Sequence, residues 1–580
     1  MVKLLKQCFC RYKGKVICVL FLVLLQVACE LALPTITASV IDVGLMNQDI
    51  KYILVHGSFM ILMSMCQVGS MIGIGYLSSI VSSAISRDLR QQIFDKTQSF
   101  SLFEMNGIGV SSLIVRTTKD VNTVRDFSVM LMRMVLVAPT MLIGSIVLTL
   151  KVNAELARVV LVSVPLLLAL FATIIINATK LFALLQKKTD HLNMLLREHL
   201  GGTRVIRAFV NQKTEQDKFE EGNDAVYRLS LKIHRITSSM MPAMMVIINL
   251  TSVAVCWFGT KQIQAGGMQV GQLVSFVQYV TQILVSLSML SILMIIAPKA
   301  NICAKRINEV LETNPVISNP ENPIEPDKNK QNGTIEFRNV SFTYPGGDSP
   351  VIRNISFTAQ GGETTAIVGS TGSGKSTLLN LIPRLYDASE GEVLLDGVNV
   401  KDYNLENLRD RLGYVPQKGV LFTGTVADNI RFGCRHASDE EVENALKISQ
   451  AWDFVCEKPG KINSEISQGG KNVSGGQKQR LAIARAIVRK CKVYMFDDSF
   501  SALDYATDSR LRNALAKDEY IGKCTRIIVA QRISTVMNAD KIIVLDNGKL
   551  AGQGKHRQLL ETCPLYNEIA SSQLSPEELV

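Results

Sequence analysis

Long apolar runs fill the first 300 residues of the chain, whereas short apolar runs alternate with polar residues in the rest. A helix needs about 20 mostly apolar residues to cross a bilayer. Six segments meet this requirement, and Glu30 is the one charged residue that they contain: 16–41, 53–86, 134–150, 159–179, 236–260 and 272–297. The pattern therefore predicts six membrane-spanning helices.

The connections between these segments alternate between short loops with little charge and long loops rich in Lys and Arg. Because Lys and Arg gather in cytoplasmic loops, we expect both long loops and both termini in the cytoplasm. Residues 87–100 and 191–225 keep the apolar spacing of helices. The sequence thus predicts that the spanning helices continue beyond the bilayer.

Composition agrees with a membrane protein of several domains. The 580 residues are 47% apolar and 19% charged, and the formal net charge is +11. A positive charge suits nucleic acid or an anionic membrane face, and the Lys and Arg that flank the apolar runs favour the membrane. Twelve cysteines are present, but the short loops expected outside contain none, so we expect no disulfide framework. Cys8 and Cys10 lack further ligands at zinc spacing.

A change of pattern divides the chain into two domains. Pro315, Pro320, Pro323 and Pro326 lie among polar residues, as is typical of a linker. From Thr334 onward, short β-rich runs alternate with helical segments, which indicates an α/β domain. The predicted fold class is a polytopic α-helical membrane domain of six spans (1–311), joined by a linker (312–333) to an α/β phosphate-loop domain (334–580).

The second domain contains a complete phosphate-binding loop, which lies between the β run 365–368 and the helical run 377–382. Glycines let backbone N–H groups close around phosphate oxygens, and the helix N-terminus adds a favourable dipole. We expect Lys375 to reach the β and γ phosphates, and Ser376 and Asp497 to hold Mg²⁺. The predicted ATP-binding residues of this loop are Gly369, Ser370, Thr371, Gly372, Ser373, Gly374, Lys375, Ser376 and Thr377.

Further residues lie at sequence spacings from the loop that suit an ATP site. Tyr344 precedes it by about 25 residues and is predicted to stack on adenine. Gln417 is a candidate to contact Mg²⁺ or the attacking water. The sequence Val473-Ser474-Gly475-Gly476-Gln477 lies just before a helical run, and Ser501-Ala502-Leu503-Asp504 follows the acidic strand.

This set of motifs resembles the ATP-binding cassette (ABC) family, whose signature appears here as VSGGQ. Six spans fused to one cassette resemble a half-transporter of the multidrug-exporter type. In that family two cassettes face each other head to tail, so the resemblance implies that Ser474, Gly475, Gly476, Gln477 and Asp504 contact the ATP of a partner chain. It also implies short coupling helices near residues 102–106 and 208–214, the second docking on the partner's cassette.

The sequence departs from the family at two positions. A glutamate that polarises the attacking water is replaced by Asp498, which is one methylene shorter. A displacement of about 1 Å at a catalytic group can cost about 10²-fold in rate. The family's switch histidine is replaced by Gln531, which carries no titratable proton. We therefore expect this site to bind ATP well and cleave it poorly, while the intact signature serves a partner's competent site.

These features together resemble the degenerate-site subunit of bacterial heterodimeric multidrug exporters, with a slow homodimer as the alternative. The predicted function is ATP-driven efflux of hydrophobic or amphipathic compounds across the cell membrane, by an ATPase that is competent with its partner. Export of a peptide or lipid, or a regulatory half-transporter, stays open. The expected ligands are ATP and Mg²⁺; the expected partners are a second half-transporter, the bilayer and a small hydrophobic substrate, with no nucleic acid. Glu30 is a candidate residue of the transport path.

Overall fold

The computed structural model describes residues 1–324 and 332–575. Two compact units divide the chain: Met1–Gln98 with Val110–Thr313, and Ser99–Gly109 with Asn314–Val580. Residues 325–331, in the expected linker, lie outside the described residues together with Pro326. The domain bounds expected at 311 and 334 stay a prediction, whereas the structural division falls after Thr313.

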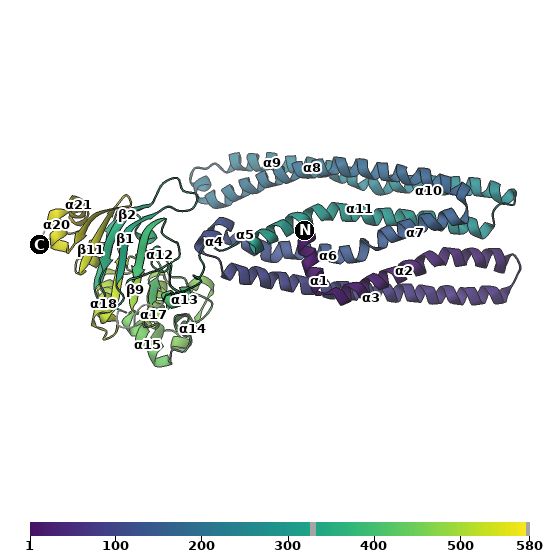
Figure 1. Cartoon of the computed structure of the whole chain (residues 1–580). Helices are drawn as coiled ribbons and strands as arrows, with labels where there is room; N and C mark the ends of the chain where they lie inside the picture. Colours follow the sequence, from purple (N-terminus) through teal and green to yellow (C-terminus); the bar gives the residue numbers. More distant parts are fainter. Residues whose placement is uncertain (325–331, 576–580) are drawn as a thin grey trace. The chain divides into compact units, whose positions relative to one another are not determined.

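The first unit is helical, and the described residues include six helical segments long and apolar enough to cross a membrane (Figure 1). Several segments consist of consecutive helices. A short helix, α1 (Val2–Arg11), precedes the six segments. The helices of the segments are α2 (Lys13–Ser39), η1 (Val40–Leu45), α3 (Ile50–Gln98), α5 (Val110–Val115), η2 (Arg116–Asp120), α6 (Val121–Met134), α7 (Val137–Val152), α8 (Ala154–Ala208), α9 (Gln212–Ser238), α10 (Met240–Gln264) and α11 (Val270–Glu312). The prediction of six spans is confirmed.

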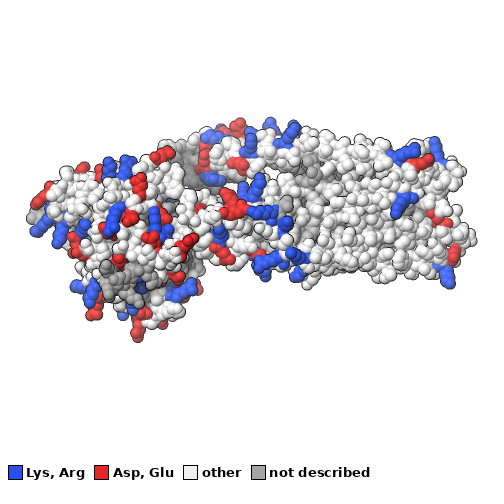
Figure 2. Space-filling view, viewed as in Figure 1, with Lys and Arg blue, Asp and Glu red and all other residues white. Residues whose placement is uncertain are grey.

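Charged side chains are distributed along this unit as expected for a membrane protein. On the face in Figure 2, a broad band without blue or red atoms crosses the helices between charged regions at their two ends. In this unit α2 buries Val19, Val23 and Val27 at a spacing of four residues, which places them on one face of the helix. The helices thus pack through apolar seams and leave other apolar side chains for lipid or a partner.

The helices extend beyond the apolar band, as predicted: α3 continues to Gln98 and α8 to Ala208. The first expected coupling helix is present as α4 (Leu102–Ile108), which begins with a capping box between Ser101 and Glu104. A separate second helix at 208–214 is not observed in this described segment. Instead, α8 ends at Ala208 and α9 starts at Gln212, because Val210 adopts a φ of 54° and reverses the chain in a short turn.

The cassette contains two larger sheets. A six-stranded sheet has the order β12-β11-β3-β10-β9-β6, and a four-stranded antiparallel sheet has the order β2-β1-β4-β5. The strands are β1 (Ile335–Phe342), β2 (Ile352–Ala359), β3 (Thr364–Gly369), β4 (Glu390–Leu395), β5 (Val398–Asn399), β6 (Leu412–Val415), β7 (Gly424–Thr425), β8 (Glu465–Ile466), β9 (Val493–Asp497), β10 (Thr525–Val529), β11 (Lys541–Asp546) and β12 (Lys549–Gly554). The centre of the first sheet is parallel and largely buried, so its strands are mostly apolar.

Helices cover these sheets and complete the α/β domain. They are α12 (Lys375–Leu381), α13 (Leu405–Asp410), α14 (Val426–Arg431), α15 (Asp439–Ile448), α16 (Trp452–Cys456), α17 (Gly475–Ile487), α18 (Tyr505–Lys517), α19 (Ile533–Val536), α20 (His556–Thr562) and α21 (Pro564–Ser571). The predicted fold class, six apolar helices fused to an α/β domain, is confirmed.

Candidate nucleotide site

Four neighbouring parallel strands bring the predicted site residues together. In the sheet, β3 pairs with β10, β10 with β9, and β9 with β6. Their carboxyl ends therefore meet at one edge, the usual place for a ligand in such sheets. The phosphate loop follows β3, Gln417 follows β6, Asp497 ends β9 with Asp498 next, and Gln531 follows β10.

The phosphate loop has the backbone that its glycines allow. Gly369 has a φ of 153°, and a Cβ there would clash with the carbonyl oxygen of Leu545. Gly374 starts α12 with a φ of 96°. The ammonium of Lys375 donates to the carbonyl oxygens of Gly369 (2.8 Å) and Ser370 (2.7 Å). Lys375 is 8% exposed, and this burial lowers its pKa, so an anion beside it would be a favourable partner.

Ser376 and Asp497 lie in direct contact. The hydroxyl of Ser376 donates to Asp497 Oδ1 at 2.7 Å, and the carboxyl is 4% exposed. Burial raises the pKa of Asp497, and neighbouring Asp498 raises it further, while Ser376 and Lys375 oppose the increase. The hydroxyl of Ser376 and the buried carboxylate of Asp497 are hard oxygen donors, which Mg²⁺ prefers. These residues fit a Mg²⁺ ion bound together with phosphate oxygens.

Asp498 is held by two glutamines. Its Oδ2 atom accepts hydrogen bonds from Gln531 Nε2 (2.8 Å) and Gln417 Nε2 (3.2 Å). Its backbone N–H donates to the carbonyl of Val529 at 3.0 Å, and its φ is 46°. The residue is 7% exposed. The two positions that depart from the family pattern are thus direct neighbours, and Gln417 shares the same carboxylate oxygen.

Tyr344 is hydrogen-bonded to the first turn of α12. Its hydroxyl shares a hydrogen bond of 2.9 Å with the hydroxyl of Thr377. Beside it lies Tyr386, which the sequence analysis did not single out; the ring centroids are 5.3 Å apart and the planes meet at 86°. Tyr386 comes just after the apolar run that follows the phosphate loop, and an aromatic residue at that point is the signal that could have found it.

The signature lies at the exposed start of α17, apart from the cluster around the phosphate loop. Ser474 and Gln477 cap this helix reciprocally: Ser474 Oγ accepts from the N–H of Gln477 (3.3 Å), and Gln477 Oε1 accepts from the N–H of Ser474 (3.0 Å). A Cβ on Gly476 would lie 3.1 Å from the carbonyl oxygen of Ala502, so the signature adjoins the segment that ends at Asp504. Asp504 caps α18 by accepting from the N–H of Thr507 at 2.9 Å.

The structure thus separates the predicted residues into two sets. One set, at the sheet edge, is Gly369 to Thr377, Gln417, Asp497, Asp498 and Gln531, with Tyr344 joined through Thr377. The other is Ser474, Gly475, Gly476, Gln477 and Asp504. Among the described residues, no hydrogen bond joins the signature to the phosphate loop. An exposed helix N-terminus attracts anions, so the second set is available to a phosphate group on another chain.

Known proteins resemble the chain over its whole length. The ABC transporter transmembrane region matches residues 16–287, and the ABC transporter family matches residues 352–501. An uncharacterized ABC transporter ATP-binding protein of Mycobacterium bovis is 41% identical over 99% of this chain and 98% of its own. The chain belongs to the ABC transporter family.

Two further relatives refine this assignment. The fatty acid ABC transporter ATP-binding/permease protein of Mycobacterium bovis is 31% identical over 83% of this chain and 75% of its own. The solved structure of a bacterial Atm1-family ABC exporter with ATP bound has a TM-score of 0.82 at 25% identity, covering 97% of this chain and 98% of that one. The protein is therefore an ABC transporter of the exporter type, a multi-pass membrane protein that binds ATP and couples an ATPase to transport.

Proposed function

We propose that this ABC transporter chain is the hydrolysis-weak half of a heterodimeric exporter. The observation that carries the proposal is the arrangement at Asp498, whose Oδ2 accepts hydrogen bonds from both Gln417 and Gln531. The chain has the groups needed to hold ATP, but its carboxylate is short and tied to two neutral amides. ATP binding would be strong at this site, and cleavage would be slow.

In this proposal ATP is held by residues from three segments. The ring of Tyr344 faces the base, and the backbone of Gly369–Ser376 surrounds the phosphates. Lys375 exchanges its bonds to the carbonyls of Gly369 and Ser370 for phosphate oxygens, and Ser376 and Asp497 hold Mg²⁺. Cleavage of ATP supplies the free energy for reopening a closed cassette pair.

Cleavage requires a group that orients and polarises water at the γ-phosphate. In this chain Asp498 would have to do so with one carboxylate oxygen already occupied by two amide donors. Gln531 itself has no titratable proton to exchange. Both residues therefore favour a long-lived ATP complex.

The intact signature supports a second, different chain as partner. Ser474 is exposed at the capped start of α17, so the dipole of this helix is accessible to the γ-phosphate on the partner's loop. On the same helix, Gln479 donates to the carbonyl of Pro416 at 3.0 Å, next to Gln417. A competent partner site completed in this way would carry the turnover of the pair.

The turn between α8 and α9 supports the same assembly. Phe209 and Val210 are 79% and 81% exposed on this single chain. Two large apolar side chains at a hairpin tip favour burial against another protein. We assign this tip to the partner's cassette, and we place the cassettes and both termini in the cytoplasm because Lys and Arg crowd the long loops.

The proposed cargo is a hydrophobic or amphipathic compound, exported across the cell membrane. Glu30 is a carboxylate in an otherwise uncharged span, and Gln282 donates to its backbone carbonyl at 3.1 Å. A buried carboxylate is costly in hydrocarbon, which makes Glu30 a candidate for the path. A lipid cargo is the second candidate, favoured by the relative that is named for fatty acids.

Transport by inverted membrane vesicles tests this function. Vesicles would contain this chain alone, the chain with a second half-transporter from the same cell, or the pair with Lys375→Ala as the control. We expect ATP-dependent accumulation of amphipathic dyes in vesicles that contain the pair, and none in vesicles that contain this chain without a partner. The Lys375→Ala pair should lose little transport, because the partner's site turns over. Transport by this chain alone at the rate of the pair would contradict the heterodimer and favour a homodimer.

A further inference from the structure

Tyr386 and Tyr344, the proposed base platform, meet in a T-shaped contact. The centroids of Tyr344 and Tyr386 are 5.3 Å apart with an interplanar angle of 86°. Buried Phe342 lies against both rings, 4.9 Å from Tyr344 and 5.5 Å from Tyr386. Edge-to-face contacts of this kind prefer one mutual orientation. The orientation of Tyr344 therefore depends on the position of Tyr386.

The other end of Tyr386 contacts α4. Asn106 Nδ2 donates to the hydroxyl oxygen of Tyr386 at 3.2 Å. Asn106 lies on α4, which belongs to the same compact unit as the cassette even though it comes from between two membrane segments. One side chain thus contacts both the proposed adenine platform and a helix from a loop of the membrane domain.

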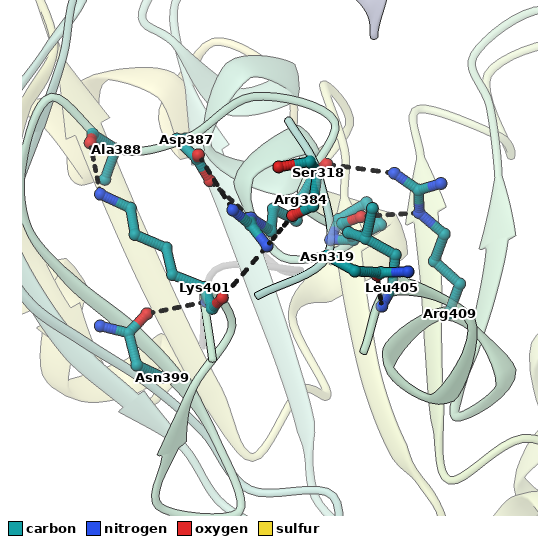
Figure 3. A network of polar contacts seen from close by, with 10 residues as sticks. Ser318, Asn319, Arg384, Asp387, Ala388, Asn399, Lys401, Leu405 and Arg409 are labelled. Atoms are coloured by element: carbon teal, nitrogen blue, oxygen red, sulfur yellow. Dashed lines mark hydrogen bonds and ion pairs between the residues drawn. The ribbon is translucent and has the colours of Figure 1, made fainter. Parts of the chain in front are cut away.

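The backbone that carries Tyr386 is held firmly. Arg384, which is 7% exposed, donates to the carbonyls of Ser318 (3.2 Å) and Lys401 (3.1 Å) and pairs with Asp387 (2.8 Å). Figure 3 shows this guanidinium at the centre of the network, between the segment that precedes the cassette and the strand region at Lys401. Arg384 and Asp387 flank Tyr386, so this network anchors the backbone from which the ring of Tyr386 projects.

A second contact ties α4 to the same region. Glu104 is 4% exposed, and its Oε1 accepts from the N–H of Val316 at 2.8 Å. Burial alone would raise the pKa of Glu104, but hydrogen bonds from Ser101 and Val316 more than offset it and lower the pKa. The carboxylate therefore stays ionised and gives α4 a second attachment, which does not involve Tyr386.

We propose that Tyr386 is a positioning residue that links occupation of the base site to the seating of α4 within one chain. Its ring orients Tyr344 for the nucleotide base, and its hydroxyl fixes α4 through Asn106. The inference rests on the proposed function, because it takes Tyr344 as the platform for the base. It goes further by assigning a role to two residues outside the nucleotide site.

Hydrogen exchange of the full chain in lipid nanodiscs tests this link. In the wild type, Mg-ATP should protect the amides of both Gly369–Ser376 and α4. Magnesium tripolyphosphate, which has no base, should protect the loop but not α4. Tyr386→Phe keeps the ring contact and loses the hydroxyl, so ATP should protect the loop as before while the ATP-dependent protection of α4 disappears. Asn106→Ala should give the same result, and the double variant should add nothing.

Affinity separates positioning from a general structural role. Tyr386→Leu removes the ring contact and should weaken ATP about 2- to 10-fold, the range of one aromatic pair, while leaving tripolyphosphate affinity unchanged. Tyr414→Phe is the matched control, because Tyr414 donates to Asn380 at 3.2 Å and likewise loses one hydroxyl bond. Unchanged α4 protection in Tyr386→Phe, or equal α4 protection by tripolyphosphate, would overturn the inference. Failure of the proposed function is distinct: rapid conversion of the bound Mg-ATP to ADP would contradict the hydrolysis-weak site, whatever the protection of α4.

Discussion

Gln531 Nε2 donates a hydrogen bond of 2.8 Å to Asp498 Oδ2. In our proposal the glutamine occupies the position of the family's switch histidine, and the aspartate occupies that of its catalytic glutamate. The shorter carboxylate and the neutral amide thus form one unit, which Gln417 completes at 3.2 Å. Two replacements that contact each other favour a site with one altered property, slow cleavage, over two unrelated changes.

The first prediction concerns restoring both residues. Asp498→Glu with Gln531→His should raise ATP hydrolysis at this site by about 10²-fold, because the carboxylate gains one methylene and a titratable ring adjoins the γ-phosphate. Single-turnover hydrolysis with bound ATP measures the effect. Each single change should give less than the pair, since Asp498 and Gln531 contact each other. Equal rates in the wild type and the double variant would place the defect elsewhere.

The second prediction concerns the buried carboxyl of Asp497. Asp497→Asn keeps the oxygen that accepts from Ser376 but removes a charge that is buried beside Asp498. Nucleotide-free protein should therefore unfold at a higher temperature. At the same time, Mg²⁺-dependent ATP affinity should fall at least about tenfold, because a metal ligand is lost.

The stabilisation by Asp497→Asn should depend on pH, because the pKa of Asp497 is raised in the folded protein. The folded-state pKa of Asp497 is raised, so wild-type stability is greatest below the ordinary carboxyl pKa and declines as pH rises through the raised value. The stabilisation by Asp497→Asn should be present at neutral pH and vanish in acid. A stabilisation that persists unchanged in acid would contradict the assigned cause. Thermal unfolding across pH measures it.

The third prediction concerns the signature cap. Ser474→Ala removes the hydroxyl that accepts from Gln477 N, which costs about 1 kcal/mol of local helix stability. ATP affinity of this chain's own loop should stay unchanged, while turnover of the heterodimer falls. Ser438→Ala is the matched control, because Ser438 caps α15 in the same way with Glu441. Equal loss of turnover in both variants would indicate destabilisation alone.

The fourth prediction concerns the tip between α8 and α9. Phe209→Ser should leave the unfolding temperature of the isolated chain unchanged, because the side chain is 79% exposed. Substrate-stimulated ATPase of the heterodimer should fall, since the ring is assigned to the partner's cassette. Tyr227→Ser, also exposed on α9, serves as control. Full stimulation in Phe209→Ser would remove this tip from the interface.

The sequence predicted those parts of the fold that depend on local pattern. The six spans follow from run length, and the phosphate loop follows from its glycines and the strand that precedes it. The contact between Asp498 and Gln531 depends on the pairing of β9 with β10, which residue spacing alone does not specify. The position of Tyr386 depends on three segments that are distant in sequence. The prediction of a separate second coupling helix at 208–214 was wrong, because a turn at Val210 lies there instead.

The nucleotide bound after prolonged turnover tests the central claim most directly. The purified chain, alone and paired with a second half-transporter, would be incubated with labelled Mg-ATP, separated quickly from free nucleotide and denatured. The labelled nucleotide would be photo-crosslinked to the protein before denaturation, and the ratio of ATP to ADP at this chain's site would then be measured. The account predicts intact ATP at this chain's site while the pair releases ADP from the other. Rapid conversion to ADP at this chain's own site, at the rate of the Asp498→Glu and Gln531→His variant, would contradict it.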